Sequence, residues 1–140
     1  MRITKQDVLK AIKTEKLKNG RWITEKTVFV KNSMGDEVRE SILDNTCAVC
    51  AVGAVLRQKG VPNQYIQTRA DDFFFYSYEP AGEVGKDGDE LQALKNKNYL
   101  SALSIKFEKL ANRLGNGQRT RTQLTKFVKD NFPKQFNVKL

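Results

Sequence analysis

Residues 47–56 read CAVCAVGAVL, ten consecutive uncharged residues that are all apolar or small, and this stretch decides the fold. A helix that is apolar on every side must be covered on every side, so we expect a buried central helix here. Asp44 or Thr46 can cap its first turn, Gly60 can adopt the left-handed conformation after its last turn, and Pro62 blocks its continuation. The other elements are expected to pack around it.

Gly53 lies inside this expected helix, where glycine is about 1 kcal/mol less favourable than alanine. This cost is accepted where a neighbouring element needs the space that a side chain would fill. The sequence therefore predicts a close helix–helix contact at Gly53.

The composition predicts one folded domain with one core, since the chain has 140 residues, of which 39% are hydrophobic and 29% charged. The N-terminus lacks the apolar segment of a signal peptide, and no run approaches the ~18 apolar residues of a membrane-spanning helix. We therefore expect a soluble protein of the cytoplasm.

An N-terminal helix is predicted from its capping residues. Thr4 is placed as the N-cap, and Asp7 stands at the third helical position, where it can complete a capping box. Val8 and Ile12 begin an apolar stripe at helical spacing, and Gly20 follows the expected end.

Two more helices are expected in the C-terminal part of the chain. Apolar residues at three- and four-residue spacing predict a helix over residues 98–114, which Gly115 would stop. The last helix is expected to begin at a cap, either Thr120 or Thr122, and to end at residues 131–133.

Extended structure is predicted from β-branched and aromatic residues. Residues 22–30 and 73–78 are expected to be strands, with 73–78 pairing along 27–30. Residues 36–43 are interpreted as one or two helical turns, and residues 79–90 as an acidic mobile loop. The predicted class is therefore α+β: an α-dominated single domain, residues 1–140, with about four helices around the central buried helix and a small antiparallel sheet.

The charge is unevenly distributed along a chain with a net charge of +9. Residues 71–90 contain seven carboxylates against one lysine, so they carry −6 and the rest of the chain carries +15. A basic body of this kind favours polyanions such as nucleic acid, or an acidic protein surface. The acidic segment would either shield that body or meet a basic partner.

Basic residues in the last two expected helices and the turn between them form a candidate binding face. They could bind phosphates or an acidic partner, although a solvated basic surface is an equally good interpretation. The candidate residues are Lys106, Lys109, Arg113, Arg119, Arg121, Lys126 and Lys129.

Aromatic residues form a second candidate surface. Core packing is the default interpretation of Trp22 and of the run at 73–78. Alternation along a strand would nevertheless leave Phe74, Tyr76 and Tyr78 in an exposed row, and they and Trp22 are candidates for partner binding.

The residues most often used in catalysis and metal binding are scarce. The chain has no histidine, which excludes Ser-His-Asp and Cys-His chemistry and most zinc sites. Cys47 and Cys50 match C-x-x-C, but zinc would need two more ligands of that kind. A redox role is possible for a thiolate at a helix start, whereas buried packing is the favoured interpretation. We expect a non-enzymatic protein without a metal or cofactor.

Three patterns in the chain resemble small uncharacterised proteins of bacteriophage genomes. They are C-x-x-C-A-V-G-A at residues 47–54, Y-L-S-x-L-S-x-x-F-E at 99–108 and L-x-x-F-V-K-x-N-F-P at 124–133. The resemblance implies a phage or mobile-element accessory protein acting in the cytoplasm of a host bacterium, and it supplies no catalytic residues.

The leading functional hypothesis is a protein that binds and inhibits a host factor, such as a defence complex that handles nucleic acid, in the manner of an anti-CRISPR protein. Its partner would be a host protein or a protein–nucleic-acid complex. The alternative is direct binding of DNA or RNA through the basic helical face, and the third hypothesis is a small enzyme or redox protein.

Overall fold

The computed structural model describes residues 1–68 and 90–139. The expected strand at 73–78, with Phe74, Tyr76 and Tyr78, and the expected loop up to residue 89 lie outside the described residues. The elements are β1 (Arg2–Thr4), α1 (Lys5–Thr14), β2 (Lys26–Lys31), β3 (Glu37–Ile42), α2 (Ala51–Gln58), α5 (Glu90–Lys95), α6 (Tyr99–Leu114), α7 (Gln118–Asn131) and β4 (Gln135–Asn137). Residues 63–68 are also helical. The predicted α-dominated α+β class is confirmed.

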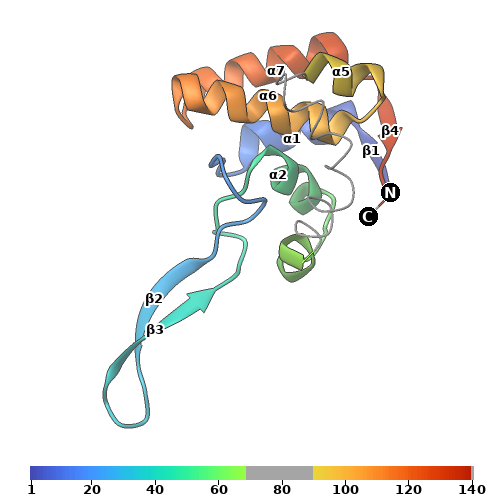
Figure 1. The fold of residues 1–140 in the computed structure, drawn as a ribbon. Coiled ribbons are helices and arrows are strands. Elements are labelled where there is room, and N and C mark those ends of the chain that lie inside the picture. Colours follow the sequence, from blue (N-terminus) through green and yellow to red (C-terminus); the bar gives the residue numbers. More distant parts are fainter. Residues whose placement is uncertain (69–89, 140) are drawn as a thin grey trace.

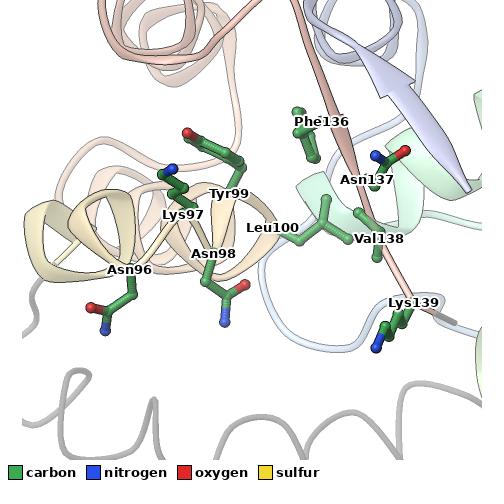
Figure 2. Close-up of a pocket in the computed structure, with 9 residues that line it drawn as sticks. All are labelled: Asn96, Lys97, Asn98, Tyr99, Leu100, Phe136, Asn137, Val138 and Lys139. Carbon is green, nitrogen blue, oxygen red and sulfur yellow. The ribbon is translucent and has the colours of Figure 1, made fainter.

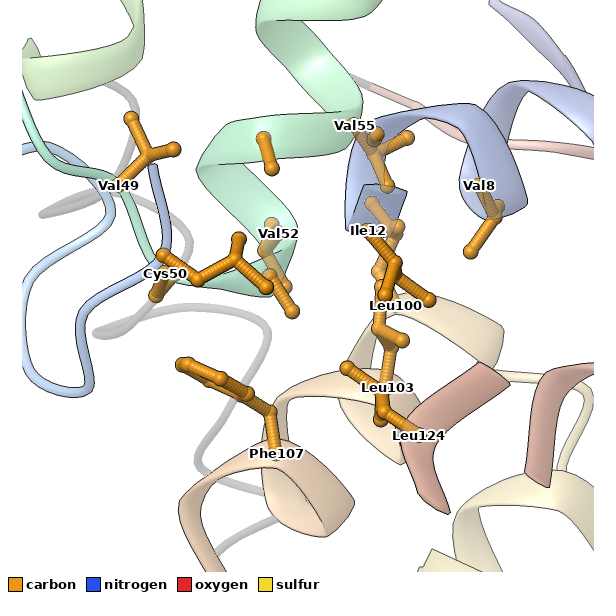
Figure 3. Packing of buried hydrophobic residues seen from close by; sticks show 14 of the residues in the cluster. Val8, Ile12, Val49, Cys50, Val52, Val55, Leu100, Leu103, Phe107 and Leu124 are labelled. Atoms are coloured by element: carbon orange, nitrogen blue, oxygen red, sulfur yellow. The ribbon is translucent and has the colours of Figure 1, made fainter. Parts of the chain in front are cut away.

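Four helices form the body of the molecule. The main packing contacts join α1 to α2, α2 to α6, α6 to α7 and α7 back to α1, which closes a ring (Figure 1). Apolar side chains from all four helices meet inside this ring, as Figure 3 shows. They include Val8 and Ile12 of α1, Val52 and Val55 of α2, Leu100, Leu103 and Phe107 of α6, and Leu124 of α7, all of them buried.

The buried helix predicted at residues 47–56 exists, but it begins at Ala51 with Cys50 as its N-cap. The expected caps Asp44 and Thr46 were wrong, because residues 47–50 precede the helix and the backbone groups of Ala48, Val49 and Cys50 are bound by other segments. The amide of Val49 donates to the carbonyl of Lys16 at 3.0 Å, and the amide of Cys50 donates to the carbonyl of Trp22 at 3.2 Å. Long-range pairing therefore replaces the first helical turn.

The end of α2 was predicted correctly. Gly60 has φ +81°, its amide donates to the carbonyl of Arg57, and the amide of Val61 donates to the carbonyl of Leu56. These two bonds and the left-handed glycine make a Schellman motif, which satisfies the last carbonyls of the helix.

A close approach at Gly53 is also confirmed, but its partner is not a helix. A Cβ atom at Gly53 would lie 2.8 Å from the carbonyl carbon of Trp22 and closer still to its oxygen. The loop that carries Trp22 thus lies directly on α2. Gly53 is required by a backbone contact, not by helix–helix packing.

The N-terminal helix begins as predicted. The amide of Asp7 donates to the Thr4 hydroxyl at 3.1 Å, and the amide of Thr4 donates to the Asp7 carboxylate at 2.9 Å, which completes the capping box. Immediately before it, β1 pairs antiparallel with β4, so that Ile3 lies opposite Phe136. The two ends of the chain are therefore held together, as Figure 1 shows.

The C-terminal helices match the predicted elements with one change. Asn98 caps α6 through its side chain, and Gly115 ends it with φ +85°. The last helix begins at Gln118 with Gly117 as its N-cap, so neither Thr120 nor Thr122 is the cap. Thr120 is instead buried, and its hydroxyl donates to the carbonyl of Gly115 at 2.5 Å, which fixes the turn between the two helices.

The predicted strand at 22–30 is present from Lys26, but the helical turns predicted at 36–43 are wrong. That segment forms β3, and it pairs with β2 in a hairpin that projects from the body (Figure 1). The turn between the strands explains why this segment is not helical. The Oδ1 atom of Asn32 accepts hydrogen bonds from the backbone amides of Met34 and Asp36, and Gly35 has φ +80°. A three-residue turn with a left-handed glycine is typical of a β-hairpin, and it directs residues 37–42 into a strand.

Candidate binding surface

The predicted basic residues do not form a single face. Lys109 and Lys106 of α6 both turn to Glu90, the first residue of α5, at Nζ–Oε distances of 2.8 and 3.8 Å. Lys106 also lies over the ring of Phe127, 5.5 Å from its centroid. Glu90, which the sequence placed in the acidic loop, therefore holds α5 against α6 and neutralises part of the expected basic face.

The electrostatics of Glu90 follow from these contacts. Its partial burial alone would raise the pKa of the carboxyl group. The hydrogen bond from Lys109 and the positive charges of both lysines outweigh that effect, and they hold the pKa of Glu90 below its usual range. The carboxylate stays ionised and the two ion pairs persist at neutral pH.

Arg121 is occupied inside the body. Its guanidinium group donates to the carbonyl of Ile12 and, at 2.7 Å, to the carbonyl of Glu15. Both carbonyls belong to the last turn and the C-cap of α1, where orphan acceptors need partners and a positive charge is favoured. Arg121 therefore joins α7 to α1 and is not available to an external phosphate.

Three of the predicted cations remain on the outer side of α7. Arg119, Lys126 and Lys129 are exposed, whereas the opposite side of that helix buries Leu124 and Val128. Arg113 is exposed on α6, and its guanidinium donates to the Gln123 side chain at 3.2 Å. Gln123 ties this arginine to the α6–α7 seam.

The cations of α1 lie on the helix next to α7. Lys10 and Lys13 are exposed, and the ammonium group of Lys5 donates to the carbonyl of Lys129 at 3.1 Å, which ties the start of α1 to the end of α7. Because the two helices pack together, the cations of α1 and of α7 lie on adjacent elements of the body. We call this group the α1–α7 basic face; it comprises Lys5, Lys10, Lys13, Arg119, Lys126 and Lys129.

Few carboxylates neutralise this face. On α1 the acidic residue is Asp7, which is already bound by Lys59 of α2 at 3.1 Å. On α7 it is Asp130, near the end of the helix. The outward lysines of α1 were visible in the sequence, but their place beside α7 was not, because it depends on long-range packing.

The predicted aromatic surface is not supported where the structure describes it. Trp22 is 8% exposed and belongs to the core, so it is not a stacking platform. Its carbonyl receives the amide of Cys50 and lies against Gly53, which fixes the loop on α2.

Both cysteines are buried, as the packing interpretation expected. Burial raises the pKa of the Cys50 thiol to about 11, so this group is neutral at physiological pH and a poor nucleophile. The sulfur of Cys47 lies 3.4 Å from the carbonyl of Ile42 and 3.4 Å from the amide of Asp44, so it helps to close the turn before residues 47–50.

A hollow of about 310 Å³ lies between the start of α6 and the C-terminal strand. Figure 2 shows its lining, residues 96–100 on one side and residues 136–139 on the other. Two of its amides are already used, since Asn98 caps α6 and Asn96 accepts a hydrogen bond from Gln92. Its described lining contains no carboxylate or thiol, and its titratable side chains are Lys97, Tyr99 and Lys139.

Within residues 1–68 and 90–139, no three His, Cys, Asp or Glu side chains gather where they could hold a metal ion. Over the same ranges, no helix has the length and apolar character needed to cross a membrane.

Comparisons with models of protein families, with curated proteins and with solved structures found no match.

Proposed function

We propose that this protein is a non-enzymatic accessory protein, of the kind carried by phages and mobile elements, that binds and inhibits a host factor through the α1–α7 basic face. The observation that supports this proposal is the arrangement of six cations on two adjacent helices with little acidic compensation. The partner would be an acidic surface of a host protein or of a protein–nucleic-acid complex, such as a defence complex.

The geometry favours binding of a large partner by this face. Lys126 and Lys129 project from one side of a helix whose opposite side is buried in the core, so the surface is convex and rigidly supported. Exposed charges of this kind steer a partner of opposite sign and accelerate association, and they contribute less to the lifetime of the complex. Inhibition would follow when the bound protein covers a surface that the host factor needs.

Direct binding of nucleic acid is the second candidate. On the exposed side of α7, Gln118 and Thr122 alternate with Arg119 and Lys126, and hydroxyl, amide and guanidinium groups are all common ligands of phosphate. Each phosphate contact releases counterions, so the logarithm of the affinity should fall by ~0.7–0.9 for each contact as the logarithm of the salt concentration rises.

A capture experiment from bacterial lysate separates these candidates and tests both. The immobilised protein is compared with the triple variant R119E, K126E and K129E, and each is used with and without nuclease treatment. A protein retained by the native chain after nuclease treatment, and lost with the variant, supports the host-factor proposal. Retention that depends on intact nucleic acid supports the second candidate.

A control variant makes the same change in net charge at a different place on the surface. The triple variant K18E, K95E and K139E alters three exposed lysines outside the α1–α7 basic face. We expect it to retain the partner. Equal losses with both triple variants, or no loss with either, would contradict a role for this face.

A further inference from the structure

The β2–β3 hairpin carries exposed apolar residues that its own fold does not cover. Residues 29–41 are all exposed, and the main contacts of β2 and β3 are with each other. Phe29 is 60% exposed and Met34 at the tip is 82% exposed. A lone two-stranded hairpin is marginally stable in water, so a further strand or surface is expected to cover it.

The alternation of hydrogen-bonded pairs along the hairpin shows which backbone groups of β2 point outward and could pair with another strand. The amide of Asn32 donates to the carbonyl of Asp36, and hydrogen-bonded and non-hydrogen-bonded pairs alternate along an antiparallel ladder. Since Lys31 lies opposite Glu37, the N–H and C=O groups of residues 27, 29 and 31 point away from β3. Within the described residues, no other strand pairs with this outer edge of β2.

We propose that the outer edge of β2 pairs antiparallel with β2 of a second copy of this chain, with Phe29 opposite Phe29. The register then places Thr27 opposite Lys31 and Val28 opposite Val30. In this register, residues 27, 29 and 31 of the two copies form the hydrogen-bonded pairs, and a four-stranded sheet results.

The side chains of β2 suit such self-pairing. The two Phe29 rings form a cross-strand aromatic pair on one face, next to Arg39, whose guanidinium already lies 5.7 Å from the Phe29 ring centroid. On the other face Val28 and Val30 of both copies become neighbours, and Val38 extends the apolar row on each side. The two lysines of β2 each meet an uncharged residue.

The outer edge of β3 does not suit a second copy. Residues 37, 39 and 41 point outward there, and a two-fold register centred on Arg39 puts two arginines opposite each other. A register centred on Glu40 opposes two glutamates, and one centred on Val38 puts Asp36 opposite Glu40. Directly opposed like charges destabilise a sheet. A register centred on Ser41 opposes no like charges, but it overlaps only the last residues of β3, which ends at Ile42, so the edge of β2 is favoured.

The expected association is weak and depends on salt in a distinctive way. Two six-residue strands bury less area than the ~1,600 Å² of a standard interface, so the dissociation constant should be micromolar or weaker. Each copy carries a net charge of +9, so the copies repel each other. Self-association should therefore strengthen as salt is added, whereas binding at the α1–α7 basic face should weaken.

Matched proline variants test the edge. Thr27 and Ser41 are opposite each other in the hairpin, and the amides of both point outward, so proline at either position spares the β2–β3 hydrogen bonds. In sedimentation equilibrium at raised salt, from micromolar up to millimolar concentrations, we expect the native chain and S41P to dimerise, and T27P to remain monomeric. Circular dichroism checks that both variants are folded.

Disulfide trapping reports the register. Hydrogen-bonded antiparallel pairs have Cα atoms about 5.5 Å apart, which suits a disulfide. We expect the variant F29C to form a cross-linked dimer on mild oxidation and S41C not to do so, while Cys47 and Cys50 are buried.

Several outcomes would overturn the proposal. They are a native chain that stays monomeric, equal effects of T27P and S41P, or equal cross-linking by F29C and S41C. A monomer would mean that this edge is covered by a segment of the same chain, such as residues 73–78, or by a foreign strand. The variant R119E, K126E and K129E should still dimerise, so failure at the basic face and failure at this edge can be told apart.

Discussion

The four-helix body and the β2–β3 hairpin differ in whether their side chains find partners within the described chain. In the body, even a buried charge is fully bound: the Arg57 side chain, 8% exposed, contacts Glu15 at 3.2 Å and donates to the carbonyl of Cys47 at 3.0 Å. In the hairpin, Phe29 and Met34 are left in solvent. The exposure of these two side chains is not explained by the described fold, and the proposed self-pairing of β2 would account for Phe29.

The largest loss of stability is expected for Arg57→Met, which tests whether the contacts inside the four-helix body are needed for its stability. Arg57 also donates to Asn63 and to the carbonyls of Asp44 and Asn45, so it joins α2 to the turn before residue 47. Its removal leaves Glu15, whose side chain is 14% exposed, beside the Gln58 amide and without an ion pair. We expect the free energy of unfolding to fall by about 3–5 kcal/mol in denaturant titrations.

Lys59→Met is the matched control for this change. Lys59 binds Asp7 with both side chains more than a quarter exposed, so the loss should be below about 1 kcal/mol. Equal losses for the two variants would contradict the difference between the buried and the exposed pair.

Gly53→Ala should destabilise by about 3 kcal/mol, although the same change in an open helix stabilises by about 1 kcal/mol. The added methyl group would overlap the Trp22 carbonyl, which must move and lose the hydrogen bond from Cys50. Gly117→Ala, where nothing lies within 4 Å of the added atom, should cost at most about 1 kcal/mol through the weaker cap. A more stable Gly53→Ala protein, measured by thermal unfolding, would show that the Trp22 loop does not lie on α2.

Local signals predicted much of the body. The capping box at Thr4 and Asp7, the left-handed Gly60 and the boundaries of α6 all depend on residues a few positions apart, and all were found from the sequence. The start of α2 was missed because Val49 pairs with residues 16–23, a contact that no local pattern encodes.

The same distinction explains the outcome at the candidate site. The sequence identified the exposed cations of α7, since Lys126 and Lys129 stand opposite its apolar stripe. It could not show that Arg121 binds the end of α1, or that Glu90 neutralises Lys109, because those partners are 106 and 19 positions away. Residue type and periodicity therefore predicted candidates, and packing decided which of them remain exposed.

A smaller effect is expected at the start of α1, where the contribution of Asp7 depends on pH. The hydrogen bond from the Thr4 amide, aided by Lys59, outweighs partial desolvation and lowers the pKa of Asp7. Because the folded pKa is the lower one, the stabilisation is present above the unfolded pKa of about 4 and is lost as pH falls through the folded value. Asp7→Asn should cost about 0.5–1 kcal/mol at neutral pH, and this cost should disappear as pH falls through the lowered pKa of Asp7. A difference between the two proteins that stayed constant from pH 7 to about pH 2 would rule out this charge effect.

The smallest change in stability is expected at Phe29, and it tests the comparison most directly. Phe29→Ser removes a large aromatic side chain that is 60% exposed, so the free energy of unfolding of the dilute protein should change by less than about 0.5 kcal/mol. Phe107→Ser is the matched control, because the same residue type is 1% exposed inside the helical ring and its loss should cost at least about 3 kcal/mol. Both are measured by denaturant unfolding at a concentration where any dimer is dissociated. If Phe29→Ser destabilised the dilute monomer as strongly as Phe107→Ser, the hairpin would have to pack within its own chain. The proposed contrast between the body and a hairpin that pairs with a second copy would then fail.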